Sequence, residues 1–109
     1  MVKGKSNIVF RRKLTELGKN IIPSSGRLWL YGSRARGNAR VDSDWDLLIL
    51  LDKEKPEFDD FKLYAYPFTL LGAEYNQEIV PQIYTKQQWE SISFTPFYKN
   101  VELEKVELV

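Results

Sequence analysis

The apolar and polar positions of this 109-residue chain repeat with two different periods, and each period predicts one kind of secondary structure. Four apolar side chains recur at helical spacing near the N-terminus: Phe10, Leu14, Leu17 and Ile21. This spacing predicts an amphipathic helix from Ile8 to Ile22, ended by Pro23. Two shorter apolar runs, Leu28–Tyr31 and Trp45–Leu51, are dense in aliphatic residues and predict buried strands.

Prolines interrupt the pattern in the middle of the chain. Pro56 follows a charged turn and is well placed in the first turn of a helix that continues through residue 72. The apolar stripe of this helix consists of Phe58, Phe61, Tyr64 or Ala65, and Phe68. Pro67 falls inside the stripe and should break or kink the helix. A stripe at this spacing is typical of a core-facing helix rather than of a base-stacking surface.

Further elements follow in the last third of the chain. Residues 77–85 predict a third strand, which Pro81 should confine to a sheet edge or a bulge. Thr85 and Gln88 form a capping-box pattern for a helix, Thr95 with Pro96 begins another short helix, and residues 106–109 could add a small strand. We therefore expect a single α/β (α+β) domain over residues 1–109, with a small mixed sheet and helices packed mainly on one side.

Composition limits the chemistry available to the chain. It has 16 basic and 15 acidic residues, which argues against a dedicated nucleic-acid binder. Cys and His are both absent, which excludes disulfides, thiolate or imidazole metal sites, and serine or cysteine triads. No stretch approaches the roughly 18 apolar residues of a membrane span, so we expect a cytoplasmic protein.

A turn of small residues follows the first predicted strand. Gly32 can take dihedrals forbidden to other residues, and Ser33 is a plausible N-cap for a helical turn over residues 34–38. The unpaired amides at the start of such a turn favour an anion such as phosphate. Arg34 could clamp that phosphate or pair with a nearby aspartate; for Arg36 we favour the ion pair.

Two aspartates open the second predicted strand. Asp44 and Asp46 share one face because side chains alternate along a strand, while Trp45 takes the other face. Two carboxylates on one face repel each other unless a cation lies between them. Mg²⁺ is the natural candidate, since it takes one or two carboxylates and completes its shell with water and substrate phosphate. The alternative, surface acids capping a turn, fits poorly with a position inside an aliphatic run.

The segments Gly-Ser-Arg-Ala-Arg-Gly (residues 32–37) and Ser-Asp-Trp-Asp-Leu (residues 43–47) resemble the G-S-x-A-R-G … S-D-x-D-[LI] signature of the minimal nucleotidyltransferases in the DNA polymerase β-like superfamily. The resemblance implies the nucleotidyltransferase fold, with the triphosphate of a nucleotide held at Gly32 and Ser33. We group Arg34 and Ser43 with them as nucleotide-binding candidates. The resemblance also implies that Asp44 and Asp46 bind Mg²⁺ and that a later strand carries a third carboxylate.

The sequence departs from the family pattern at the position of the third carboxylate. Aligning the corner after residue 84 puts Val80 where the family often has an aspartate. Glu78 lies two residues earlier, hence on the same face, and could reach the same ion or act as the base. The alternative is an ordinary exposed glutamate at a sheet edge, which would leave the catalytic set incomplete.

The resemblance implies Mg²⁺-dependent transfer of AMP from ATP to an acceptor hydroxyl, catalysed by Asp44, Asp46 and Glu78. Single-domain members of this family are commonly paired with a helical HEPN protein in toxin–antitoxin arrangements, which implies a partner protein as acceptor. The alternative is a catalytically weak binding module that holds a partner or a nucleotide. A third possibility, RNA-directed nucleotide addition, is disfavoured by the near-neutral charge of the chain.

Overall fold

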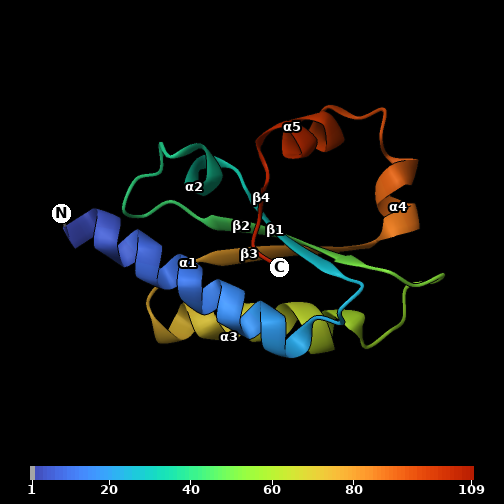
Figure 1. Cartoon of the computed structure of the whole chain (residues 1–109), viewed down its shortest axis with the longest axis horizontal. Coiled ribbons are helices and arrows are strands. Elements are labelled where there is room, and N and C mark those ends of the chain that lie inside the picture. The colour runs from blue at the N-terminus through green and yellow to red at the C-terminus, as the bar shows by residue number, and fades with distance from the viewer. Residues whose placement is uncertain (1) are drawn as a thin grey trace.

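Four strands form one mixed sheet in the computed structural model, which describes residues 2–109, with side chains described from Asn7 onward. The strands are β1 (Arg27–Tyr31), β2 (Trp45–Leu51), β3 (Ile79–Thr85) and β4 (Val106–Glu107). Their order across the sheet is β3-β2-β1-β4 (Figure 1). β1 runs antiparallel to β2 and β4, whereas β2 and β3 are parallel. The expected mixed sheet is confirmed.

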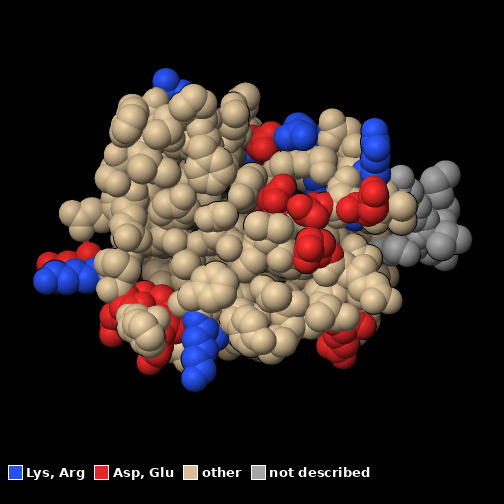
Figure 2. Space-filling model, turned by 180° about the vertical axis from the view of Figure 1, so that it is seen from behind, with Lys and Arg blue, Asp and Glu red and all other residues tan. Residues whose placement is uncertain are grey.

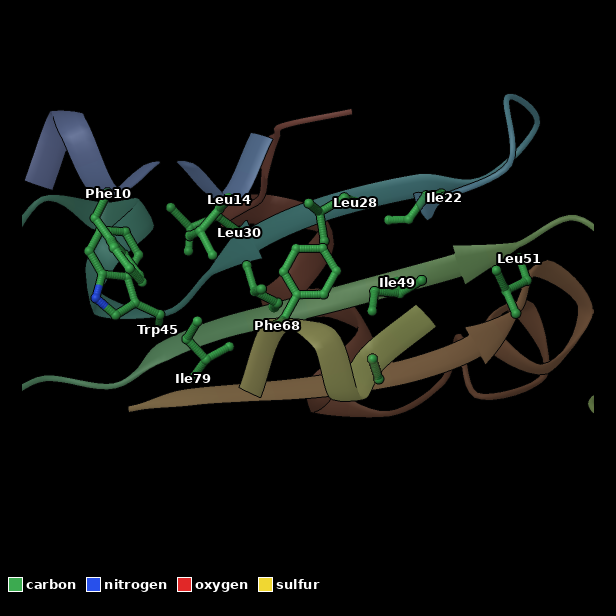
Figure 3. Packing of buried hydrophobic residues seen from close by; sticks show 12 residues of the cluster. Phe10, Leu14, Ile22, Leu28, Leu30, Trp45, Ile49, Leu51, Phe68 and Ile79 are labelled. Carbon is green, nitrogen blue, oxygen red and sulfur yellow. The ribbon is translucent and has the colours of Figure 1, made fainter. Parts of the chain in front are cut away.

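Helices cover both faces of this sheet, and the longest helix lies on one side together with a second helix (Figure 1). That side carries α1 (Val2–Ile21), the π-helical turn η1 (Phe61–Ala65) and α3 (Tyr66–Glu74), whose side chains meet inward-facing residues of β1 and β2 (Figure 3). The main cluster contains Phe10, Leu14, Ile22, Leu28, Leu30, Trp45, Leu47, Ile49, Leu51, Ala65, Phe68 and Ile79.

The opposite face is covered by two short helices, α4 (Lys86–Ser91) and α5 (Pro96–Glu104). They bury a second cluster consisting of Trp29, Leu48, Leu50, Trp89 and Val101. The alternation of side chains along β2 feeds both clusters: Leu47 and Ile49 face the first, and Leu48 and Leu50 face the second. The sheet is therefore the central layer between two sets of helices.

The middle of the chain differs from the prediction. Pro56 precedes the helix instead of opening it, and Phe58 is fully exposed instead of belonging to the apolar stripe. A hydrogen-bonded turn takes the place of the expected first helical turn: the Asp60 carboxylate accepts from the Glu57 amide at 2.7 Å and from Lys53 at 2.6 Å. The helix begins as η1 only after this turn.

Pro67 lies at the start of α3, directly after η1. Proline is tolerated in the first turn of a helix because its missing N–H has no intrahelical acceptor there. The break expected at this proline is thus a change from a π-helical turn to an α-helix. Phe68 beside it is fully buried, as the stripe predicted.

The predicted strands and helices in the last third of the chain are present in the predicted order. β3 is an edge strand that contains Pro81. Thr85 and Gln88 form the expected capping box, and the Thr95 side chain caps α5. β4 is shorter than expected. Within residues 2–109, no helix is long and apolar enough to cross a membrane.

Candidate active site

The start of β2 is fixed by Trp45. Its indole nitrogen donates to Gln77 at 2.9 Å, and its ring lies against Phe10 with 5.0 Å between centroids. This packing commits Trp45 to the core and turns Asp46 to the opposite face, as the alternation predicted. In the sheet register Asp46 is paired with Tyr31, the last residue of β1.

Gly32 brings the end of β1 against the Asp46 carboxylate. Its φ of 77° and ψ of −160° are disfavoured for residues with a side chain. A Cβ at this position would overlap the Asp46 carboxylate group. Gly32 is therefore required both by the backbone and by the approach of the acid.

The helical turn after Gly32 is α2 (Ser33–Arg36). The expectation that Ser33 caps this turn is wrong: Gly32 occupies the N-cap position, no side-chain cap bond forms, and Ser33 is the first helical residue. The unusual backbone of Gly32 starts the turn one residue earlier than the sequence indicated. Ser33 is half-buried beside the site.

Arg34 is buried, with 5% of its surface exposed. Its guanidinium donates to the Ser43 carbonyl at 2.9 Å, to the Val41 carbonyl at 3.2 Å and to the Asn7 side chain at 2.9 Å. It also lies 4.5 Å over the Trp45 ring. We find no ion pair between Arg34 and an aspartate in the described part of the chain. These contacts hold the loop that leads into β2.

Ser43 completes this loop. Its hydroxyl accepts from the Arg40 amide at 2.8 Å, and its carbonyl accepts from Arg34. Asp44 follows, exposed, just before β2 begins. It is separated from Asp46 by Trp45 alone, and its charge adds to the effect of burial in raising the pKa of the Asp46 carboxyl.

A third acidic residue lies at this place, Glu104, which was not among the residues predicted from the sequence. One carboxylate oxygen accepts from the Gly32 amide at 2.9 Å, and the other accepts from Arg36 at 2.9 Å. The ion pair expected for Arg36 exists, but its partner is Glu104 instead of an aspartate. Acidic and basic side chains gather over α2, the start of β2 and the end of α5 (Figure 2). No local signal in the sequence marks Glu104.

The electrostatics of the site follow from partial burial and like charges. Burial raises the pKa of the Asp46 carboxyl; Asp44 and Glu104 raise it further, while Arg36 lowers it. Burial also raises the pKa of Tyr31 to about 12, with the charge of Asp46 adding to the effect. The negative charges of Asp44 and Glu104 close to Asp46 favour binding of a cation.

Glu78 lies one residue before β3, with its side chain exposed. Its carbonyl accepts from the Trp45 amide at 2.8 Å, which fixes its backbone at the same end of the sheet as Asp44. The register pairs Val80 with Asp46 directly. The position beside Asp46 on the neighbouring strand thus carries an apolar side chain.

Among residues 7–109, whose side chains are described, no group of three or more acidic side chains is arranged so as to hold a metal ion. Two neighbouring carboxylates, Asp44 and Asp46, still match Mg²⁺, which binds through one or two carboxylates and takes its other ligands from water and phosphates. All the donors here are oxygens, as a hard cation requires. The residues present fit this ion only together with a phosphate-bearing substrate.

A glycine turn packed on a strand that bears two neighbouring carboxylates is suited to binding a polyphosphate together with a divalent cation. The chain belongs to the Nucleotidyltransferase domain family, which it matches over residues 9–108. The family resemblance and the fold expected from the sequence are both confirmed.

Two similar proteins give this assignment context. The chain is 53% identical over 34 residues to Protein adenylyltransferase MntA of Aphanizomenon flos-aquae (strain 2012/KM1/D3); the alignment covers 31% of this chain and 23% of that relative. It also resembles a crystal structure of a toxin–antitoxin with AMP-PNP, with a TM-score of 0.63 and 19% identity. That match covers 91% of this chain and 72% of the solved one, and it shows the shared fold.

Proposed function

We propose that the protein transfers a nucleoside monophosphate, AMP from ATP, to an acceptor hydroxyl. The observation that supports this most directly is the contact between the Gly32 turn and the Asp46 carboxylate. A polyphosphate at the turn and a cation at the carboxylates would be neighbours in this arrangement. Family membership and the partial match to an adenylyltransferase add support.

In this proposal Gly32 and Ser33 bind the phosphates, and Asp44 and Asp46 hold Mg²⁺. When bound, Mg²⁺ would supply positive charge against the triphosphate. Arg34 and Ser43 contribute indirectly, because their mutual hydrogen bond orders the loop that presents both aspartates. Positioning and charge stabilisation account for most of the rate in reactions of this kind.

The transfer step balances as an in-line displacement. The acceptor oxygen forms a bond to the α-phosphorus, the bond from that phosphorus to the bridging oxygen breaks, and pyrophosphate leaves. The acceptor proton needs a base; the chain has no His, so this role falls to a carboxylate or to the metal ion, and we assign it to a carboxylate. Glu78, exposed at the same end of the sheet, is our candidate base.

A partner protein of the helical HEPN type is the acceptor in our proposal. The similarity in fold to a toxin–antitoxin structure supports this arrangement. The absence of basic excess makes a nucleic-acid acceptor less suitable, because nucleic-acid binding requires positive charge to offset phosphates.

One observation favours a second function, a binding module with weak or no catalysis. Val80 stands beside Asp46 in the parallel register, where a third carboxylate would complete the acidic set. A site with two carboxylates could still bind a nucleotide without transferring it. The two functions share the binding step and differ in the transfer step.

The test is incubation with α-labelled ATP, Mg²⁺ and extract of the source cells, with transfer to macromolecules measured on a gel. Asp46→Asn should abolish label transfer. Asp52→Asn, an exposed carboxylate just after the other end of β2, is the matched control and should transfer normally. ATP binding without transfer in the unsubstituted protein supports the binding module, and failure to bind ATP rejects both functions.

A further inference from the structure

The Glu104 carboxylate takes up the two donors that face the acidic site. The Gly32 amide and the Arg36 guanidinium each donate to a different Glu104 oxygen, both at 2.9 Å. A backbone amide and an arginine are also a donor pair that binds phosphate oxygens in proteins. Glu104 therefore presents to these donors the same kind of acceptor that a phosphate would.

The fold holds Glu104 in this position. It is the last residue of α5, which is anchored by buried Val101. Two residues later Val106 pairs with Leu30, close to the end of β1 that leads into Gly32. Only 19% of the Glu104 side chain is exposed. The docking of α5 and β4 thus places the carboxylate beside both donors, one of which, the Arg36 side chain, is 47% exposed.

The position of Glu104 is electrostatically unfavourable without its two donors. Its charge acts on Asp46, which already has Asp44 as a neighbour. Neighbouring carboxylates repel each other, and partial burial strengthens the repulsion. The Gly32 amide and the Arg36 guanidinium compensate for this repulsion. A ligand that binds these two donors therefore leaves the Glu104 carboxylate next to Asp46 without its stabilising contacts.

We propose that Glu104 occupies the position of a nucleotide phosphate in the free protein and competes with the nucleotide for Gly32 and Arg36. This inference rests on the function proposed above and concerns the regulation of the same site. Nucleotide binding requires the carboxylate to swing away from both donors, after which Arg36 contacts the phosphate. The apparent affinity for the nucleotide is therefore reduced, because only the molecules in which Glu104 does not contact Gly32 and Arg36 can bind it.

The test compares ATP binding, with Mg²⁺ present, by the unsubstituted protein and by variants at residue 104. Glu104→Gln is nearly isosteric but loses the charge, and Glu104→Ala removes the acceptor. Both should bind ATP more tightly, by on the order of tenfold, because the competing state is lost. Arg36→Gln should bind more weakly, because it loses a phosphate contact as well as the ion pair.

Glu102→Gln is the matched control for charge on α5. It removes one negative charge two residues away from Glu104. The Glu102 carboxylate accepts from Trp89, a member of the second hydrophobic cluster, at 2.8 Å and from Lys105 at 2.7 Å. ATP affinity should not change in this variant. An equal gain in Glu102→Gln and Glu104→Gln would reject the proposal, since the effect would be general electrostatics.

The ¹⁵N–¹H resonance of the Gly32 amide gives a readout that does not require transfer. It should shift in Glu104→Ala and in the unsubstituted protein saturated with inorganic triphosphate. Equal ATP affinity in the unsubstituted protein and both Glu104 variants overturns the competition while leaving the proposed function intact. Absence of ATP binding in every variant overturns both, whereas binding only in the Glu104 variants supports the competition.

Discussion

The Asp46 carboxylate lies so close to Gly32 that a methyl group on residue 32 would overlap it. Gly32 directly follows β1 and Asp46 lies in β2, so their contact joins the proposed phosphate-binding turn to the acidic edge of the sheet. Gly37, at the other end of α2, also has a positive φ, of 85°, but a Cβ there would meet nothing within 4 Å. These two glycines form a natural pair for experiment.

Gly32→Ala should destabilise the protein by about 2–3 kcal/mol and abolish ATP binding, because backbone strain is combined with displacement of Asp46. Gly37→Ala should cost about 1 kcal/mol through strain alone and keep ATP binding. Urea unfolding and equilibrium binding measure the two effects. Normal ATP binding by Gly32→Ala would contradict the proposed site.

Arg34→Lys should destabilise the fold by about 2–3 kcal/mol. A lysine cannot reproduce the hydrogen bonds of the buried guanidinium to the Ser43 and Val41 carbonyls, each worth about 1 kcal/mol. Arg40→Lys, at an exposed position in the same loop, should change stability by less than about 0.5 kcal/mol. An ATP-binding defect in Arg34→Lys at unchanged stability would instead indicate direct contact with phosphate.

Phe68→Ala should cost about 3–5 kcal/mol, because Phe68 is fully buried against β1 and β2 and its removal leaves a cavity (Figure 3). Phe58→Ala should be nearly neutral, because Phe58 is fully exposed. Thermal or chemical unfolding distinguishes them. Comparable losses would mean that residue 58 packs in solution as the helical stripe first suggested.

Asp60 should make the stability of the protein depend on acid pH. Burial by itself would raise the pKa of Asp60, but hydrogen bonds from the Glu57 amide and Lys53 outweigh it, so the pKa is lowered. A lowered folded-state pKa contributes stability that is present above about pH 4 and is lost as pH falls through the folded value.

Asp60→Asn should therefore be less stable at neutral pH and lose less stability on acidification. Asp59→Asn, at an exposed neighbouring position, is the control and should follow the unsubstituted protein. Urea unfolding at a series of pH values from neutral to about 3 tests this. Parallel pH profiles for Asp60→Asn and the unsubstituted protein would contradict the expected linkage.

The sequence by itself determined the strands of the core and the face of β2 on which Asp46 lies. β2 was predicted with its observed bounds, and Asp46 was placed opposite Trp45, because alternation along a strand is a local property of the chain. Gly32 was likewise identified from a local conformational need. The capping box at Thr85 is local as well, and it forms as predicted.

The three-dimensional structure decided what depends on specific side-chain contacts, some within loops and others between elements distant in the sequence. The turn at Asp60 displaced the expected helix start, because its bonds to Lys53 and Glu57 satisfy polar groups that a helix would use differently. Arg34 was drawn into the loop by carbonyls that the fold brings near it. Glu104 reaches Gly32 only because β4 pairs with β1 and α5 docks beside it. Neither the periodicity nor the composition of the chain specifies such long-range pairings, since these depend on packing between whole elements.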